Sequence, residues 1–249
     1  MYSTESRQLN RAARCSPRGT YFFSPCIARA NPPYSIKQWD RGAFENDKYG
    51  RNFLGTPPQG RADYAFFQHI LKSLKPDTGR CAILFPHGVL FRDEEADMRR
   101  KLIESDLVDC VIGLGPNLFF NSPMEACIVI CRTNKPLAHR GKVMFINAVH
   151  DVIRKNSQSY LTDEHIEKIA GAYREYSEID GFAHATSIDD IAQHNYSLNI
   201  VLYANPTTEE NDKDDRSFSE CYSGWDESRF DLSMKYDDLL SMIGGEQNA

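Results

Sequence analysis

Residues 63–86 read DYAFFQHILKSLKPDTGRCAILFP, and this stretch contains the two kinds of element that decide the fold class. Over 63–75, four apolar residues recur at steps of three and four, the spacing of one face of a helix: Tyr64, Phe67, Leu71 and Leu74. Residues 81–85 form a short, almost wholly apolar run closed by Pro86, which is typical of a strand covered on both faces of a sheet. A helix, a turn and a buried strand in succession predict an α/β fold.

The same alternation continues downstream of this pair. Residues 93–104 predict a second helix, with acids in its first turn and basic residues toward its end, as the helix dipole favours. Two apolar runs of β character follow, 108–114 and 126–131, joined by a loop that no helix fits. We therefore expect these two runs to be antiparallel neighbours, and we expect one more strand over 142–149, at an edge of the sheet.

The last part of the chain is predicted to be mainly helical. A capping threonine or serine followed by acids opens each of two helical patterns, a long one over 162–176 and a brief one over 187–194. We expect a small helical extension over 151–206, after a catalytic domain over 30–150. An acidic, solvated linker and tail should then follow over 207–249, with one more helix near its end.

The first part of the chain differs from the rest. Residues 1–29 contain five arginines and a single acid, and their apolar periodicity is poor, so this segment is expected to be loosely structured. Pro25 also argues against a central strand here. A rigid turn begins at Asn31, and a polar loop runs from it to about Arg61, a length typical of a functional rim.

Composition limits the function classes. A chain of 249 residues, 41% of them hydrophobic, is long enough for one core and a helical appendage. The formal net charge of -6 gives no overall basic surface, so any contact with nucleic acid must be local or come from a partner.

Cysteine usage and hydropathy bear on the compartment. The seven cysteines form no Cys-x-x-Cys pair, and the histidines form no cluster at zinc spacing, so we expect reduced thiols and no metal site. No apolar run approaches the roughly 18 to 20 residues that span a bilayer, and the N-terminus lacks a signal pattern. The sequence therefore predicts a cytoplasmic protein that does not contact a membrane.

The turn Asn31-Pro32-Pro33-Tyr34 contains residue types suited to one reaction. An exocyclic adenine amine is a poor nucleophile because its lone pair is delocalised into the ring. If the Asn31 side-chain oxygen and the Pro32 carbonyl accept hydrogen bonds from that amine, the nitrogen moves toward tetrahedral geometry and its lone pair points at a methyl donor. Consecutive prolines stiffen the turn, and Tyr34 offers a flat face on which a flipped base can stack.

The same four residues also fit an ordinary surface turn. The order of the elements favours the catalytic interpretation, because the turn precedes an α/β/α/β series that ends in two antiparallel runs, as in the second half of a methyltransferase sheet. The pair Gly113 and Gly115 is a weak match to a cofactor loop, and it lies downstream of the turn, so we reject it as one.

The turn, extended by Ser35 and Trp39, resembles the catalytic motif of gamma-type amino-methyltransferases. The chain is similar to the methylation subunit of type I restriction-modification systems over about residues 30–204. Segments that carry this likeness, besides the turn, are 62–70, 79–88, 112–120, 161–166, 181–182 and 195–200. The resemblance implies the C-terminal half of a Rossmann-like, S-adenosylmethionine-dependent methyltransferase sheet with a terminal antiparallel hairpin.

The resemblance also implies an activity and a set of site residues. It implies methylation of adenine N6 in double-stranded DNA, with S-adenosylmethionine as the methyl donor and specificity and restriction subunits as partners. Residues 31–34 would form the amine and base site, and Asn31 would also border the cofactor. Phe119 or Phe120 would close over the other face of the base, although adjacent phenylalanines near a hairpin are as typical of a core.

One part of the family's pattern is missing. Such enzymes bind S-adenosylmethionine with a glycine-rich turn and an acid, both upstream of the motif, and only thirty residues precede Asn31 here. We therefore expect a truncated or rearranged subunit that is active only with a separate N-terminal half. Half a sheet would expose an edge and an apolar face, so the chain alone is expected to be marginally stable and prone to association.

Two other function classes remain open. A non-catalytic fragment would use its C-terminal helices to dock specificity or restriction subunits. A protein-glutamine or RNA methyltransferase would use the same kind of turn, because that turn suits any planar amide or amine. The C-terminal segments that resemble the type I family argue against this last class.

Overall fold

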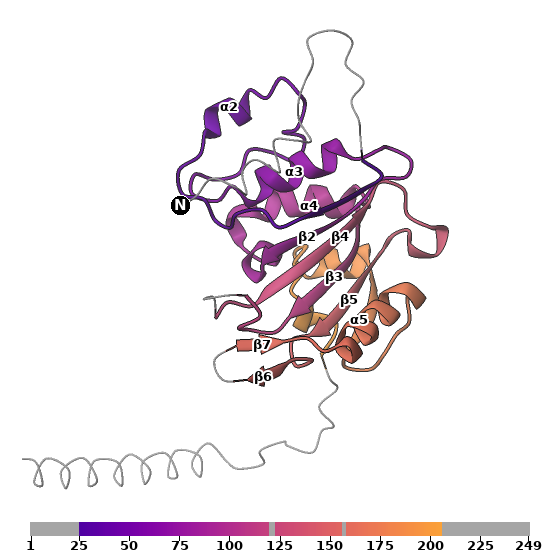
Figure 1. The fold of residues 1–249 in the computed structure, drawn as a ribbon. Coiled ribbons are helices and arrows are strands. Elements are labelled where there is room, and N and C mark those ends of the chain that lie inside the picture. The colour runs from indigo at the N-terminus through magenta and orange to yellow at the C-terminus, as the bar shows by residue number, and fades with distance from the viewer. Residues whose placement is uncertain (1–24, 120–122, 156–157, 206–249) are drawn as a thin grey trace, which may run out of the picture. The chain divides into compact units, whose positions relative to one another are not determined.

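A six-stranded mixed sheet organises the residues that the computed structural model describes, 25–119, 123–155 and 158–205 (Figure 1). The strand order is β1-β2-β4-β3-β5-β8. The strands are β1 (Ile27–Ala30), β2 (Arg80–Pro86), β4 (Ala126–Arg132), β3 (Val108–Leu114), β5 (Lys142–Ala148) and β8 (Ala183–Ser187). β1 is parallel to β2 and β3 is parallel to β5, whereas β4 is antiparallel to both of its neighbours. The predicted α/β fold and the predicted antiparallel pairing of 108–114 with 126–131 are confirmed.

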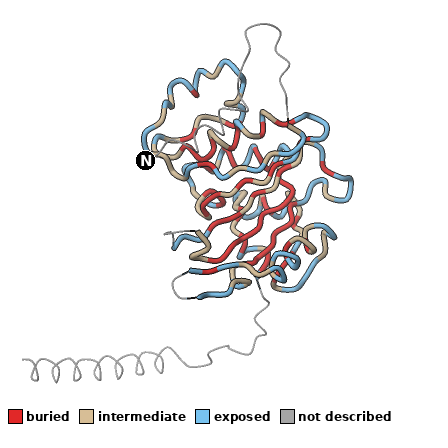
Figure 2. The backbone as a smooth tube through the Cα atoms, viewed as in Figure 1, coloured by how far each residue is buried: buried red, intermediate tan, exposed pale blue. Residues whose placement is uncertain are grey.

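Helices pack on both faces of this sheet (Figure 1). One face carries α3 (Asp63–Ser73), α4 (Ala96–Glu104), α6 (Ile188–Gln193) and a 3-10 turn (Ile200–Leu202), and the other carries α5 (Asp163–Glu175). Figure 2 shows the buried residues concentrated along the strands between these layers. The remaining elements are α2 (Arg41–Glu45), the hairpin β6 (Ile153–Lys155) and β7 (Gln158–Tyr160), and three 3-10 turns, His87–Leu90, Asp93–Glu95 and Leu137–His139. Within the described ranges, none of the helices combines the length and the apolar character that crossing a bilayer requires.

The helices predicted within the described residues are all present. The helix predicted over 93–104 begins as a 3-10 turn and continues as α4. The two C-terminal helices begin where the capping signals placed them: the Thr162 hydroxyl accepts from the His165 amide, and the Ser187 hydroxyl accepts from the Asp190 amide. The predicted linker and tail over 207–249 lie outside the described residues.

The prediction that 1–29 is loosely structured is wrong for its last residues. Ile27–Ala30 form β1, which pairs in parallel with β2. Backbone bonds from Lys75 to Pro25 and from Arg80 to Cys26 extend this pairing toward the N-terminus. Pro25 lies before the strand and β1 lies at the edge of the sheet, so the argument that this proline excludes a central strand still holds.

Two further predictions about strands need correction. The strand predicted over 142–149 is β5, but it lies between β3 and β8 and is not at an edge. The edge strand on that side is β8, whose sequence Ala-His-Ala-Thr-Ser contains no large apolar side chain that would predict a strand. Together with β6 and β7, it shows that 151–206 contains strands as well as helices.

One face of the sheet is covered only in part by the described residues. α5 packs against β5, while the side chains of β2 and β4 on the same face remain partly exposed: Ala82, Leu84, Ile128 and Ile130. Ile27 on the neighbouring edge strand is 53% exposed. This part of the chain therefore presents a sheet edge and an adjoining apolar face, as expected of half a sheet.

Candidate functional site

The turn of residues 31–34 begins directly after Ala30, the last residue of β1. It therefore lies at the carboxyl end of the parallel pair β1–β2, where open α/β sheets bind their ligands. Asn31 and Pro33 are exposed, Pro32 is buried and Tyr34 is partly buried. The turn is therefore open to solvent at Asn31 and Pro33 and anchored in the protein at Pro32.

Two acceptors of this turn have no partner within the described ranges. Among the described residues, neither the Asn31 side chain nor the Pro32 carbonyl oxygen has a hydrogen-bond partner. Both come from consecutive residues of a turn whose backbone is stiffened by proline, so the backbone that carries them is held before a ligand binds. The pair can accept the two hydrogens of one planar amine.

Tyr34 contributes a ring and not a working hydroxyl group. Its hydroxyl is enclosed by protein and has no hydrogen-bond partner within the described part of the chain. Burial, followed by the nearby Cys127 and Asp63, raises the pKa of Tyr34 to about 12, so the phenol stays neutral at physiological pH. The arrangement suits stacking on a flat ligand better than proton transfer.

Tyr34→Phe is expected to leave the free energy of unfolding unchanged or to raise it by up to about 1 kcal/mol, because it removes a buried hydroxyl that lacks a partner among the described residues. The matched control is Tyr173→Phe. The Tyr173 hydroxyl donates to Asp109 Oδ2 at 2.6 Å, and its loss should lower the free energy of unfolding by about 1–3 kcal/mol. Urea denaturation of both variants checks this, and an equal loss in the two would contradict the difference between the two hydroxyls.

The residue after the turn is held by a buried carboxylate. Ser35 has a φ of 45°, a left-handed conformation that disfavours a serine by about 1–2 kcal/mol. Its amide donates to Asp63 Oδ1 at 2.8 Å, and its hydroxyl lies 3.5 Å from Asp63 Oδ2. Asp63 is the first residue of α3 and is only 1% exposed. The end of the turn is thus tied to the start of a helix 28 residues away in the sequence.

Arg92 and Glu95 complete this cluster. Arg92 Nη1 lies 2.9 Å from Asp63 Oδ2 and 3.4 Å from Glu95 Oε2. Glu95 is fully buried, and its other carboxyl oxygen has no partner among the described residues. Burial raises the pKa of Glu95 to about 7, Arg92 opposes that rise and Asp63 adds to it. The cluster therefore contains a carboxyl group that is partly protonated near neutral pH.

Glu95→Gln is expected to reduce the pH dependence of stability. Because the pKa of Glu95 rises from its ordinary value of 4.5 to about 7 on folding, its protonation stabilises the fold below about pH 4.5, and this stability is lost as the pH rises through about 7. The shift corresponds to a contribution on the order of 3 kcal/mol. Urea denaturation at about pH 5 and about pH 8 should show a larger loss in the unmodified chain than in the variant. Equal losses would show that Glu95 does not titrate in this way.

Phe119 follows β3, a strand that is not adjacent to β1 in the sheet. Phe119 lies in the loop after β3, partly buried, and the Ser159 amide ties this loop to β7 by donating to the Asn117 carbonyl at 2.9 Å. Because β3 is three strand spacings from β1, the two strand ends are separated by roughly 14 Å. Phe120 lies outside the described residues. The role assigned to this pair stays a prediction.

His87 is a candidate that the sequence analysis missed. It follows Pro86 directly at the carboxyl end of β2, next to the end of β1. Its Nδ1 lies 3.2 Å from Glu125 Oε2, and its enclosed Nε2 has no partner among the described residues. Burial lowers the pKa of His87, which favours the neutral ring. The available signal was its place immediately after the proline that closes a buried strand.

The glycines rejected as a cofactor loop have packing roles. Gly113 lies inside β3, where an added Cβ would be 2.8 Å from Ile200 Cδ1. A Cβ on Gly115 would lie 2.5 Å from the Val149 carbonyl oxygen. Both positions exclude a larger residue because neighbouring segments approach closely.

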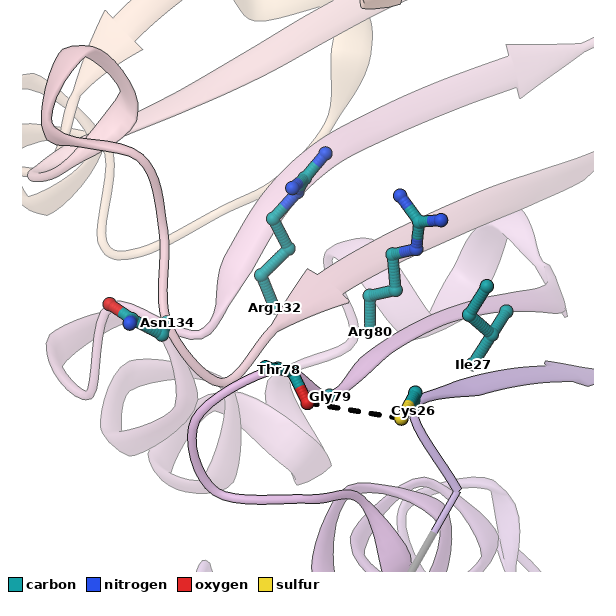
Figure 3. A pocket seen from close by; sticks show the side chains of 7 residues that line it. All are labelled: Cys26, Ile27, Thr78, Gly79, Arg80, Arg132 and Asn134. Atoms are coloured by element: carbon teal, nitrogen blue, oxygen red, sulfur yellow. Dashed lines mark hydrogen bonds between the residues drawn. The ribbon is translucent and has the colours of Figure 1, made fainter.

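A cavity of about 230 Å³ lies at the opposite end of β1 (Figure 3). Ile27, Arg80 and Arg132 are among its lining residues, and the two arginines project from neighbouring strands. Its position at the amino ends of β1 and β2 separates it from the turn. It is therefore not part of the candidate site.

Known proteins match most of this chain. The family model described as N-6 DNA Methylase matches residues 26–212. The type I restriction enzyme MjaVIII methylase subunit of Methanocaldococcus jannaschii is 36% identical over 191 residues, which are 74% of this chain and 32% of the relative. The HindI methylase subunit of Haemophilus influenzae is 30% identical over 193 residues, 74% of this chain and 42% of the relative.

Solved structures agree with this family match. A type I restriction-modification methyltransferase subunit from Streptococcus thermophilus superposes with a TM-score of 0.69 at 36% identity, over 76% of this chain and 40% of that subunit. The EcoKI M protein is similar in fold, with a TM-score of 0.54 at 17% identity, over 90% of this chain and 50% of that protein. The chain spans between 32% and 42% of the length of the curated relatives named above.

Proposed function

The chain belongs to the N-6 DNA methylase family, and on that premise we propose that residues 31–34 bind the amine of a flipped adenine in double-stranded DNA and present it to S-adenosylmethionine. The observation that supports this proposal is the pair of acceptors on Asn31 and Pro32, which have no partner among the described residues, at the carboxyl end of β1.

In the proposed reaction, the main contribution of this chain is to hold the adenine amine in the correct orientation. The Asn31 side-chain oxygen and the Pro32 carbonyl accept the two N6 hydrogens, which directs the nitrogen lone pair away from the ring plane. Tyr34 stacks on the base and holds it in the orientation that these two bonds require. S-adenosylmethionine supplies the methyl group. The amine needs no base before the transfer, because the lone pair itself is the nucleophile. As the nitrogen–carbon bond forms, the methyl–sulfur bond would break and leave S-adenosylhomocysteine, and the methylated nitrogen would then release one proton to solvent.

Among the described residues, Asn31 is the one that we assign to the binding site of the methyl donor. Asn31 is exposed at the end of β1, but the described part of the chain holds no glycine-rich turn between a strand and a helix that would bind the rest of such a molecule. We therefore assign the remainder of the donor site to a polypeptide segment outside these residues. The outer side of β1 and the adjoining apolar face are the surfaces that such a segment would cover.

The domain division is part of the same proposal. Residues 30–150 would supply the base site, and 151–206 would support contacts with the specificity and restriction subunits of a type I complex. Exposed apolar side chains in the second range fit a docking role: Ile166 is 49% exposed and Val201 is 51% exposed. The DNA recognition sequence would be set by the specificity subunit and not by this chain.

Reconstitution tests the proposal. The chain is mixed with the part of the Streptococcus thermophilus subunit that lies outside its match to this chain, together with the specificity subunit of that system. Incorporation of labelled methyl groups into unmethylated DNA is then measured. We expect methylation by the mixture and none by either methylase polypeptide alone.

Two outcomes would contradict parts of this proposal. Binding of S-adenosylmethionine to the chain alone with micromolar affinity, measured by calorimetry, would show that the donor site is not supplied from elsewhere. A mixture that assembles with the specificity subunit but never methylates DNA would favour the alternative, a non-catalytic fragment that docks to the other subunits.

A further inference from the structure

We propose that Asp63 is a positioning residue for the base site: through Ser35 and Arg92 it fixes where the turn presents its two acceptors. This inference rests on the proposed function, and it assigns a role to a side chain that lies outside the turn and contacts the residue next to it. Three observations carry it: the contacts of the carboxylate, the conformation of Ser35, and the place of Arg92 after the neighbouring strand.

The contacts of Asp63 join two segments at the same edge of the sheet. One carboxylate oxygen accepts from the Ser35 amide at 2.8 Å, and the other accepts from Arg92 Nη1 at 2.9 Å. Ser35 follows the end of β1, and Arg92 follows the 3-10 turn after β2. Because β1 and β2 are parallel neighbours, the carboxylate links the two segments that leave adjacent carboxyl ends. A displacement of either segment would break a bond to Asp63.

The conformation of Ser35 shows why the turn needs this link. A serine with a φ of 45° is held in a region that side chains other than glycine seldom adopt. Without a fixed acceptor for its amide, the backbone at this position would relax toward negative φ. That relaxation would rotate the peptide bonds just before Ser35 and would move the Pro32 carbonyl and the Asn31 side chain. The acceptors would then no longer be set for an amine before it arrives.

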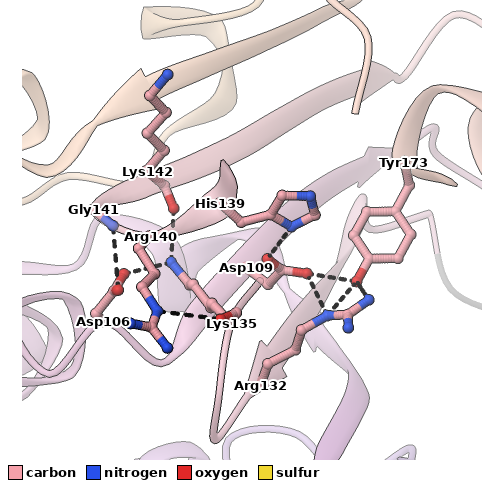
Figure 4. A network of polar contacts seen from close by, with 9 residues as sticks. All are labelled: Asp106, Asp109, Arg132, Lys135, His139, Arg140, Gly141, Lys142 and Tyr173. Atoms are coloured by element: carbon pink, nitrogen blue, oxygen red, sulfur yellow. Dashed lines mark hydrogen bonds and ion pairs between the residues drawn. The ribbon is translucent and has the colours of Figure 1, made fainter. Parts of the chain in front are cut away.

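A second buried Asp–Arg pair provides a matched control. Asp109 is fully buried and lies 2.8 Å from Arg132 Nε, and His139 and Tyr173 contact the same carboxylate (Figure 4). Asp109 is the second residue of β3, so it lies toward the amino edge of the sheet, away from the turn. Substitution there should disturb the protein about as much as substitution of Asp63, without touching the base site.

The first readout needs neither DNA nor methyl donor. Hydrogen exchange of the Ser35 amide, followed by nuclear magnetic resonance on the full chain, should accelerate by at least about tenfold in Asp63→Ala, because the amide loses its acceptor. Asp63→Asn keeps an oxygen for that amide and should restore its protection. Asp109→Asn should leave Ser35 unchanged. Should Asp63→Ala fail to fold, Asp63→Glu takes its place, since it keeps the charge but moves the oxygen away from its present position.

The second readout is the kinetics of the reconstituted methyltransferase. We expect kcat to fall by about 10- to 100-fold in Asp63→Ala, with the KM for S-adenosylmethionine changed by less than about threefold, because a displaced turn disturbs the geometry of transfer and not donor binding. Asp63→Asn should recover most of kcat, and Asp109→Asn should keep it within about twofold.

The outcomes separate this inference from the function on which it rests. Unchanged Ser35 exchange in Asp63→Ala, or an equal loss of kcat in Asp109→Asn, would overturn the positioning role. Full methylation by Asn31→Ala would overturn the proposed function instead, and with it the catalytic part of this inference. Loss of methylation in Asn31→Ala together with normal kcat in Asp63→Ala would remove the positioning role alone.

Discussion

Asn31→Ala is expected to lower kcat for adenine methylation by about 10²- to 10³-fold, the size of effect seen when one preorganised polar group at a reacting centre is removed. The Asn31 side chain is exposed and has no hydrogen-bond partner among the described residues, so its removal leaves no buried group unsatisfied there. The free energy of unfolding should therefore change by less than about 0.5 kcal/mol. A large catalytic loss without a loss of stability is the signature of a group that acts on the substrate.

Asn134→Ala is the control for this substitution. Asn134 is also exposed, but it lies in the cavity at the amino ends of β1 and β2, and its side chain accepts from Arg140 at the surface. Its substitution should leave kcat within about twofold of the unmodified chain. Initial rates at saturating methyl donor, measured in the reconstituted enzyme, compare the two variants directly. If the two variants lost the same amount of activity, the loss would be caused by impaired assembly of the enzyme and not by a change in the base site.

Phe85→Ala is expected to lower the free energy of unfolding by about 3–5 kcal/mol, the range for a fully buried phenylalanine in a core. Phe85 is 0% exposed in β2, and its ring lies 5.1 Å from that of Phe67 on α3. The substitution removes a contact between the sheet and the helix that begins with Asp63. Because the free energy of unfolding of a domain is only about 5–15 kcal/mol, a loss of this size would remove a large part of the total stability.

Leu137→Ala is the matched control for the core. Leu137 is 81% exposed, so its truncation should change the free energy of unfolding by less than about 0.5 kcal/mol. Urea denaturation followed by far-ultraviolet circular dichroism measures both variants. Equal midpoints for Phe85→Ala and the unmodified chain would show that β2 and α3 do not pack as described.

The elements that the sequence predicted share one property, a strong apolar pattern. β2, β3 and β4 are mainly apolar runs, interrupted inside β3 only by Asp109, and α3 and α5 have an apolar face together with a clear start. In such segments the local pattern and the tertiary burial agree, so the pattern alone identifies the element. Their antiparallel order also followed from the connection between β3 and β4, which no helix fits.

The elements that the sequence missed gain their structure from neighbours. β8 contains alanine, histidine, threonine and serine, and it becomes a strand because β5 offers it an edge to pair with. β1 alternates between partly buried and exposed residues, so its pattern is short and weak. Because β8 pairs with β5 on its outer side, β5 lies inside the sheet and β8 forms the edge. Pairing between distant segments is not visible in a local pattern.

The residues of the candidate site also divide into those that the sequence predicted and those that it missed. The turn of residues 31–34 could be found because four consecutive residue types suit one reaction. Asp63 and Arg92 could not, because their contacts join residues 28 and 29 positions apart and depend on how α3 meets the ends of two strands. The sequence showed Asp63 only as the acid that starts a helix, which is a sufficient local reason for it.

In the proposed reaction, the turn at the end of β1 presents the adenine amine for methylation. The most direct test is to digest the DNA methylated by the reconstituted enzyme and to identify the labelled nucleoside, with Asn31→Ala treated in parallel. We expect the label in N6-methyldeoxyadenosine and its near absence with the variant. Label on a cytosine, or undiminished N6-methyladenine formation by Asn31→Ala, would contradict this role of the turn.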